Sequence, residues 1–132
     1  MTGDGAAARV GYVSFVVRCV PRVDREEFCN IGVVLYSQMA DYLAIAHDVP
    51  SPRLATFAPD LDVDVVLGAL STMDAVCRGD ASAGPLAAAT RRERFGWLSA
   101  PRSTVVQPGP VHGGLTHDPA AELTRLLALL VG

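Results

Sequence analysis

The stretch that decides the fold is YVSFVVRCV, residues 12–20, which is followed by CNIGVVLYS, residues 29–37. Apolar residues recur at every second position of the first run, as in a half-buried β-strand: Val13, Phe15, Val17 and Cys19. The second run is rich in β-branched residues and predicts a second strand. One face of this second strand is expected to carry Cys29, Ile31, Val33 and Leu35.

A third run, DYLAIAHD, covers residues 41–48. The gap from Gln38 to Ala40 is short enough for a hairpin, so the second and third strands are expected to be antiparallel neighbours. Pro21 ends the first strand because proline cannot donate to a β-ladder. The three strands together predict a meander.

Helical signals begin after residue 50. Ser51 followed by Pro52 predicts an N-cap and a short helix to Phe57, and Asp60 or Asp62 predicts the cap of a longer helix that Gly79 ends. A further short helix is expected over residues 86–92. Asp118 followed by Pro119 predicts a C-terminal helix with leucines on one face.

These elements predict an α+β fold in a single domain, residues 10–132, preceded by a disordered leader, residues 1–9. The sheet is expected to be mainly antiparallel, with three or four strands. Two main helices, residues 60–78 and the C-terminal helix, are expected to pack together on one of its faces.

Composition narrows the class of protein. The chain has 132 residues, 50% of them hydrophobic, a net charge of −3 and eleven basic residues that are all arginine. No apolar run approaches the roughly 20 residues that cross a bilayer, and the N-terminus lacks the basic start and apolar core of a secretory signal. We therefore expect a cytoplasmic protein with reduced cysteines, no membrane contact and little affinity for nucleic acid.

The segment RFGWLSAPRSTVVQPGPVHGG, residues 94–114, holds three prolines and is expected to be mostly irregular, with one edge strand over Ser103–Gln107. An arginine with a hydroxyl pair and backbone amides beside glycines can bind a phosphate or carboxylate. The alternative is a stiff structural wrap in which Trp97 fills the core. The donors in this segment are Arg94, Trp97, Arg102, Ser103, Thr104, Gln107 and His112.

Two polar residues interrupt the first two strands, Arg18 and Asn30, and each needs a partner if it is buried. Glu26 or Glu27 is a candidate partner for Arg18, and an anion-facing Arg18 is the alternative. The histidines show no ligand pair at a fixed spacing, so no metal or other cofactor is predicted. No nucleophile motif of the GxSxG type occurs.

Two blocks resemble a known family. YVSFVVRCVPRVDREEFCNIGVVLYS, and later RFGWLSAPRSTVVQPGPVHGGL with its Asp-Pro helix of leucines, resemble the two halves of a bacterial family, domain of unknown function 3037 (DUF 3037). The resemblance spans most of residues 12–131 and is loose between Tyr42 and Arg92. It implies a compact cytoplasmic protein, often encoded beside a kinase-like protein of the HipA type, and thus an accessory or binding partner. It carries over no catalytic residue.

The leading hypothesis is a binding or regulatory module that presents a polar, arginine-bearing surface to a protein partner or an anionic ligand. The residues proposed for that site are Arg18, Asn30, Arg94, Arg102, Ser103, Gln107 and His112. The alternative is a small enzyme for a phosphorylated or nucleotide substrate, in which Arg18 and Arg102 clamp the anion and His112 transfers the proton. A third possibility is a homodimer that pairs through a sheet face or an edge strand.

Overall fold

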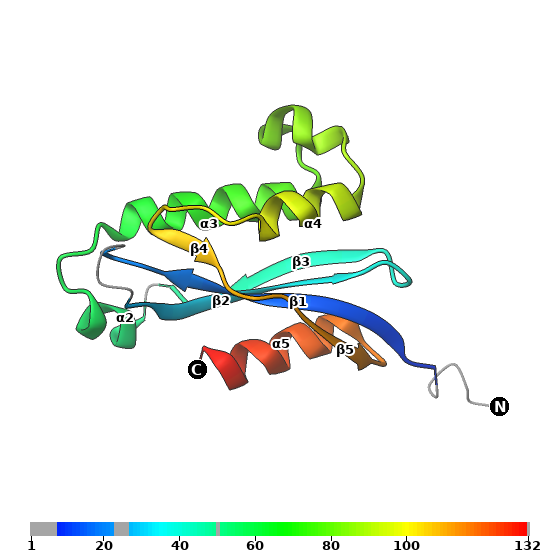
Figure 1. Ribbon diagram of the computed structural model, residues 1–132, viewed down its shortest axis with the longest axis horizontal. Coiled ribbons are helices and arrows are strands. Elements are labelled where there is room, and N and C mark those ends of the chain that lie inside the picture. Colours follow the sequence, from blue (N-terminus) through cyan, green and yellow to red (C-terminus); the bar gives the residue numbers. More distant parts are fainter. Residues whose placement is uncertain (1–7, 23–26, 50, 132) are drawn as a thin grey trace.

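The computed structural model describes residues 8–22, 27–49 and 51–131. A single five-stranded antiparallel sheet lies between two helical layers (Figure 1). The helices α3 (Val63–Arg78) and α4 (Arg91–Ser99) cover one face, and α5 (Pro119–Leu130) covers the other. The α+β class is as predicted, and the residues 1–7 of the expected leader lie outside the described residues.

The first three strands form the predicted meander. They are β1 (Val10–Cys19), β2 (Cys29–Ser37) and β3 (Tyr42–His47), and the sheet order places β2 between the other two. The pairs β1–β2 and β2–β3 are antiparallel, as expected. The apolar face of β1 is also as predicted, because Phe15, Val17 and Cys19 all contribute to the core beneath α3.

The proline-rich segment is more regular than predicted. It contains the C-terminal part of α4 and two short strands, β4 (Val106–Pro108) and β5 (His112–Thr116). Both pair antiparallel with β1 along the same edge, β4 with its C-terminal end and β5 with its N-terminal end. The sheet therefore has five strands rather than three or four, because β1 orders a stretch whose prolines and glycines hide the strand pattern.

A β-bulge changes the expected faces of β2. Val17 pairs with Gly32 but Arg18 pairs with Asn30, so that Ile31 is an extra residue in β2. Cys29 and Ile31 consequently join the core on the α3 side, whereas two residues predicted to share their face, Val33 and Leu35, lie on the α5 side. Gly32 is required at this point because a Cβ there would lie 2.8 Å from the carbonyl oxygen of Ala46.

The predicted helix caps occur at α2 (Pro52–Phe57), α3 and α5, where Ser51, Asp62 and Asp118 accept hydrogen bonds from backbone N–H groups. Gly79 ends α3 in the left-handed conformation. The expected helix over residues 86–92 is replaced by a 3-10 segment, η2 (Ala81–Ala88), and by α4. A capping box between Thr90 and Glu93 starts α4 three residues before the segment predicted to be irregular.

The two main helices lie on opposite faces, not on one face as predicted. Buried side chains on the α3 side form the larger core, and Leu123, Leu126 and Val131 pack on Val33 and Leu35 to form a second, smaller one. The bulge moves Cys29 and Ile31 to the larger core, so that Val33 and Leu35 are the residues of β2 in the second core. No helix in the described residues has the length and apolar character needed to cross a bilayer.

A polar contact fixes α5 to the sheet. The hydroxyl of Tyr12 donates to Oε2 of Glu122 at 2.5 Å, and Arg125 donates to both carboxylate oxygens, at 2.8 and 2.7 Å. These hydrogen bonds hold the pKa of Glu122 at about 2. Burial, with the neighbouring Glu122 carboxylate, raises the pKa of Tyr12. The ring of Tyr12 lies over Gly114, where a Cβ would come within 2.5 Å of it.

Candidate functional site

The predicted site residues occupy separate places in the fold. Arg18, Asn30 and Gln107 lie in one row across the sheet, because Arg18 pairs with Asn30 of β2 and with Gln107 of β4. The two sequence blocks therefore converge at Arg18. Cross-strand partners point to the same side, and this side carries α5, since Asn30 Nδ2 donates to the carbonyl of Leu130 at 3.1 Å.

Arg18 is held by apolar and backbone neighbours. Its guanidinium carbon lies 4.0 Å from the centroid of the Phe28 ring, in cation–π geometry. A Cβ on Gly109 would lie 3.2 Å from Arg18 Nε. That Nε and Oδ1 of Asn30 are buried with no hydrogen-bond partner in the described part of the chain. The sequence predicted Glu26 or Glu27 as the partner of Arg18. Within the described part, no ion pair joins Arg18 to Glu27. Glu26 lies outside the described residues.

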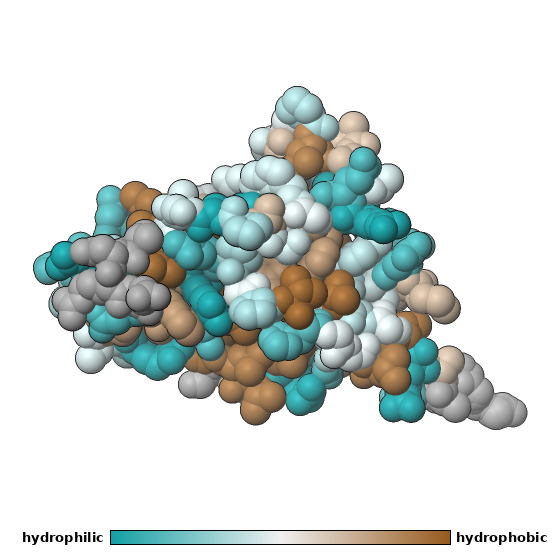
Figure 2. Space-filling model, viewed as in Figure 1, coloured by the Kyte–Doolittle hydropathy of each residue, from teal (hydrophilic) through white to brown (hydrophobic). Residues whose placement is uncertain are grey.

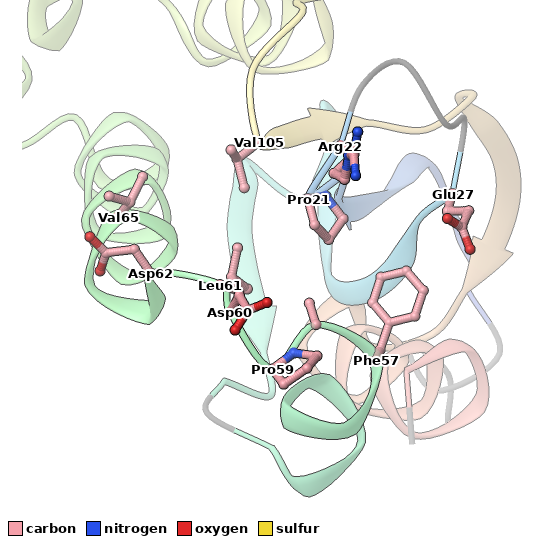
Figure 3. Close-up of a pocket in the computed structure, with 11 residues that line it drawn as sticks. Pro21, Arg22, Glu27, Phe57, Pro59, Asp60, Leu61, Asp62, Val65 and Val105 are labelled. Atoms are coloured by element: carbon pink, nitrogen blue, oxygen red, sulfur yellow. The ribbon is translucent and has the colours of Figure 1, made fainter.

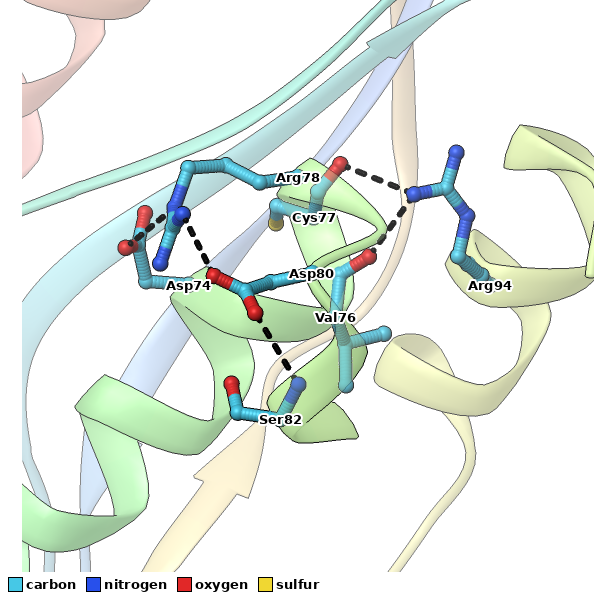
Figure 4. Close-up of polar contacts among 7 residues, drawn as sticks. All are labelled: Asp74, Val76, Cys77, Arg78, Asp80, Ser82 and Arg94. Carbon is cyan, nitrogen blue, oxygen red and sulfur yellow. Dashed lines mark hydrogen bonds and ion pairs between the residues drawn. The ribbon is translucent and has the colours of Figure 1, made fainter. Parts of the chain in front are cut away.

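Arg94 is enclosed by the protein and does not face a site that is open to a ligand. It is buried at 7% exposure, and Nη1 donates to the carbonyl oxygens of Val76 and Cys77 at 3.0 and 3.2 Å (Figure 4). These carbonyls belong to the last turn of α3, where that of Val76 also accepts a hydrogen bond from the Gly79 N–H at 3.2 Å. Arg94 therefore joins α4 to the end of α3. Beside it, Arg78 bridges Asp74 and Asp80 at the surface.

A groove runs between α3 and the chain that connects α4 to β4. Two cavities of about 510 and 500 Å³ share Pro21, Val65 and Val105 in their linings, so they lie side by side along this groove. In the first, Phe57 and Val65 stand on opposite sides, with Pro21 and Val105 between them (Figure 3). In the second, α3 contributes Val65, Ala69, Thr72 and Met73.

Trp97 and Arg102 line the second cavity and are absent from the lining of the first. The guanidinium carbon of Arg102 lies 4.6 Å from the Trp97 ring centroid, and Nη2 donates to the Trp97 carbonyl oxygen. Ser103 and Thr104 line the same cavity. Trp97 is 40% exposed and does not fill the core, contrary to the structural alternative drawn from the sequence. The arginine and hydroxyl pair predicted to bind an anion thus stand in a mainly apolar cavity.

The clamp required by the enzyme hypothesis is not assembled. Arg18 lies on the α5 side of the sheet, whereas Arg102 lines the cavity on the α3 side. His112 is exposed at the start of the edge strand β5, opposite Ser14, and lines neither of the two cavities. The three residues that this hypothesis needs in one pocket are therefore dispersed.

A family comparison covers nearly the whole chain. The family described as "Protein of unknown function (DUF3037)" matches residues 15–131. The chain belongs to this family. No curated protein and no solved structure matches it. The family resemblance inferred from the two blocks is confirmed, and the family's description assigns no activity that these residues could perform.

The described residues of this family member contain no metal site, and two of its three cysteines are unreactive thiols. No three side chains among its histidines, cysteines and acids gather in this part of the chain in a way that could hold a metal ion. Burial raises the pKa of Cys19 to about 11 and that of Cys77 to about 12, so both remain protonated thiols at neutral pH.

The apolar groove residues were not singled out by sequence reasoning. Phe57 lies on α2 and Val65 on α3, and neither belongs to the apolar residues that its helix buries. The only sequence signal for the groove is that these two apolar residues stand at outward-facing positions. Apolar side chains also reach the surface along α5 (Figure 2), where Leu129 and Leu130 are exposed. The α5 surface forms neither of the two cavities.

Proposed function

We propose that this protein is a binding module whose groove receives an apolar segment of a partner polypeptide, with Arg102 recognising an acidic group at one end of that segment. The observation that carries the proposal is the Trp97–Arg102 stack in a mainly apolar cavity that adjoins a second cavity with charged residues in its lining. Tryptophan and arginine are the residue types most enriched at the energetic centres of protein interfaces.

The groove favours a polypeptide over a small polar metabolite. Phe57, Val65 and Trp97 expose apolar surface along its length, at 37%, 54% and 40% of their full accessibility. Clustered exposed apolar side chains of this kind are typical of interaction sites. The combined cavities have the dimensions of a short peptide rather than of one anion, and burying their lining supplies a hydrophobic contribution that an anion alone would lack.

The guanidinium of Arg102 is positioned to bind an acidic group. The ring beneath it and the Trp97 carbonyl oxygen hold its guanidinium in place, so little side-chain entropy is lost on binding. Within the described residues, no carboxylate forms an ion pair with it. The guanidinium is therefore available for a charge-assisted hydrogen bond.

The opposite end of the groove has the complementary charge. Asp60 and Asp62 line the first cavity on the side of α3, and Arg22 and Glu27 line it on the opposite side (Figure 3). The preferred segment is therefore apolar in the middle, basic at the α2–α3 end and acidic at the Arg102 end. The kinase-like protein of the HipA type that the family resemblance implies, in the bacterial cytoplasm, is the first whole protein to test.

Trp97 is the single tryptophan of the chain, so its emission reports directly on the groove. The experiment titrates the protein with a panel of ten-residue peptides that have an apolar centre, arginine at one end and glutamate at the other. Each peptide has a twin in which glutamine replaces the glutamate. We expect a shift in Trp97 emission and binding about tenfold tighter for the glutamate peptides, as for a hydrogen bond between charged groups.

The matched variants are Arg102→Ala and Arg92→Ala. Arg92 is exposed on α4 and lines neither cavity. Arg102→Ala should abolish the preference for glutamate while the thermal midpoint changes little, and Arg92→Ala should keep the preference. The proposal is wrong if no peptide of the panel shifts the emission, or if Arg102→Ala discriminates between the twins as the natural chain does.

A further inference from the structure

The two edges of the sheet differ in how well they are protected from pairing. One edge is formed by β4 and β5, which contain Pro108 and are separated by Gly109–Val111 with a second proline, Pro110. Proline removes N–H donors, and a break in the strand prevents a continuous ladder. This edge therefore resists the addition of another strand.

The edge formed by β3 has none of these protections. Its six residues pair with β2 in one unbroken register, from Tyr42 opposite Ser37 to His47 opposite Gly32. The strand contains no proline, no lysine and no bulge. Four of its six residues, Tyr42, Ala44, Ile45 and Ala46, are half-buried, whereas the adjacent strand β2 is almost wholly buried. Regular, apolar edges of this kind are ready to pair with another strand.

The backbone of β3 shows which groups are available. The Asp48 N–H donates to the Ile31 carbonyl oxygen at 3.0 Å, so residues of even number face β2 in this antiparallel ladder. Leu43, Ile45 and His47 therefore direct their N–H and C=O groups to the open edge. Hydrogen-bonded pairs in a new antiparallel ladder must come from these odd positions.

We infer that β3 pairs with β3 of a second copy of this chain, antiparallel and with Ala44 opposite its own counterpart. This register joins Leu43 to Ile45 of the other copy through the available backbone groups, and it brings Asp41, the turn residue before β3, next to His47 of the other copy at both ends. The sheet then continues through the two-fold axis as ten strands. The interface is self-complementary, as a two-fold dimer requires.

Charge and packing both favour this register. The Asp41 carboxylate accepts an imidazole N–H from His47 of the other copy, and its present ion pair with Arg91 is long and exposed, at 3.9 Å. A register centred between Ala44 and Ile45 would instead put Asp41 opposite Asp48, where like charges repel. That register would also mix the two faces, because Leu43 and Ile45 belong to the α3-side core and Tyr42 and Ala44 to the α5-side core.

The first experiment measures the mass of the natural chain in solution by sedimentation equilibrium over a range of concentrations. We expect twice the 13.9 kDa of one chain. His47→Asp places like charges at both ends of the ladder and should weaken the dimer at least tenfold. His47→Asp combined with Asp41→Asn removes the repulsion and should restore part of the affinity. A natural chain that remains monomeric at all concentrations overturns the inference.

Disulfide cross-linking between cysteines introduced into β3 tests the register independently of how stable the dimer is. The two residues of a non-hydrogen-bonded pair, such as Ala44 and its counterpart, have Cα atoms about 4.5 Å apart, within the range of a disulfide. Ala44→Cys should therefore cross-link to a covalent dimer on mild oxidation, whereas Ala46→Cys, whose expected neighbour is Tyr42, should not. The three natural cysteines are buried and give a low background. Cross-linking of both variants to the same extent, or of neither, contradicts this register.

The dimer and the groove are independent proposals. Trp97 and Arg102 lie at the β4 side of the sheet, away from the β3 edge. A monomeric chain that still binds the glutamate peptides would refute only the dimer, and a dimer that binds none of them would refute only the groove function.

Discussion

The guanidinium of Arg94 occupies the space that a side chain at residue 79 would need. A Cβ on Gly79 would lie 2.6 Å from Arg94 Nη1, the same nitrogen that donates to the last carbonyls of α3. Gly79 also has φ of +64°, a conformation that side chains with a Cβ rarely adopt. One glycine thus ends α3 and admits the arginine that joins α4 to it.

This relationship predicts that Gly79→Ala costs more stability than its backbone conformation alone explains. The control is the same substitution in an Arg94→Ala background, where no guanidinium fills the space and only the φ of +64° opposes the new Cβ. In that background we expect Gly79→Ala to cost about 1–2 kcal/mol. The loss for Gly79→Ala in the natural chain should be larger by about 1–3 kcal/mol, as for overpacking. Urea denaturation measures both, and equal losses would refute the role of Arg94.

A second pair of glycines tests how Tyr12 packs on β5. A Cβ on Gly114 would lie 2.5 Å from the Tyr12 ring, whereas one on Gly113 meets only the Tyr12 carbonyl oxygen at 3.8 Å. Gly114→Ala should displace the ring, break its hydrogen bond to Glu122 and destabilise the domain by about 1–3 kcal/mol. Gly113→Ala should remain within about 0.5 kcal/mol of the natural chain. Thermal unfolding of the two variants distinguishes these outcomes.

The Glu122 carboxylate predicts a loss of stability in acid. Its pKa is lowered from 4.5 to about 2, first by its hydrogen bonds with Arg125 and then by that with Tyr12. A lowered pKa stabilises the folded state above pH 4.5, and the contribution is lost as pH falls towards 2. Allowing for solvent screening, we expect about 1 kcal/mol. Glu122→Gln should flatten this part of the curve of unfolding free energy against pH, and an unchanged slope would contradict the assignment.

The buried thiols should be unreactive in the folded protein. Cys19 and Cys77 have pKa values raised to about 11 and 12 by burial, and Cys29 is buried as well. An aromatic disulfide reagent at about pH 8 is therefore expected to label the native chain slowly and all three cysteines in denaturant. Rapid labelling of one native thiol would identify an accessible, reactive cysteine instead.

Local signals predicted the elements wherever a short stretch of chain decides its own structure. Ser51, Asp62 and Asp118 cap helices through hydrogen bonds to residues two or three positions away, so their side-chain chemistry was sufficient. The alternation along β1 was equally informative because that strand contains no bulge. The capping box of Thr90 and Glu93 is a signal of the same kind, and it could have located α4.

The places of the candidate residues in the fold were only partly predictable. Arg102 and Ser103 lie together in the groove, and Arg18, Asn30 and Gln107 lie together across the sheet. Their separation onto two faces was not predictable, because Arg102 and Ser103 lie in the loop before β4, and the course of that loop along α3 depends on tertiary packing. Arg94 appeared as a free donor in the sequence, and only the packing of α4 on α3 makes it a structural one.

The sequence by itself determined the class of fold, the three-stranded meander and the boundaries of the capped helices, because these depend on periodicity and on neighbours within a few residues. Only the tertiary structure decided where α5 lies, how β2 presents its apolar residues and which arginines remain open. The physical reason is that these features depend on residues far apart in the chain: at Ile31, for example, pairing with β1 adds one extra residue, which shifts the faces of one part of β2 relative to the rest.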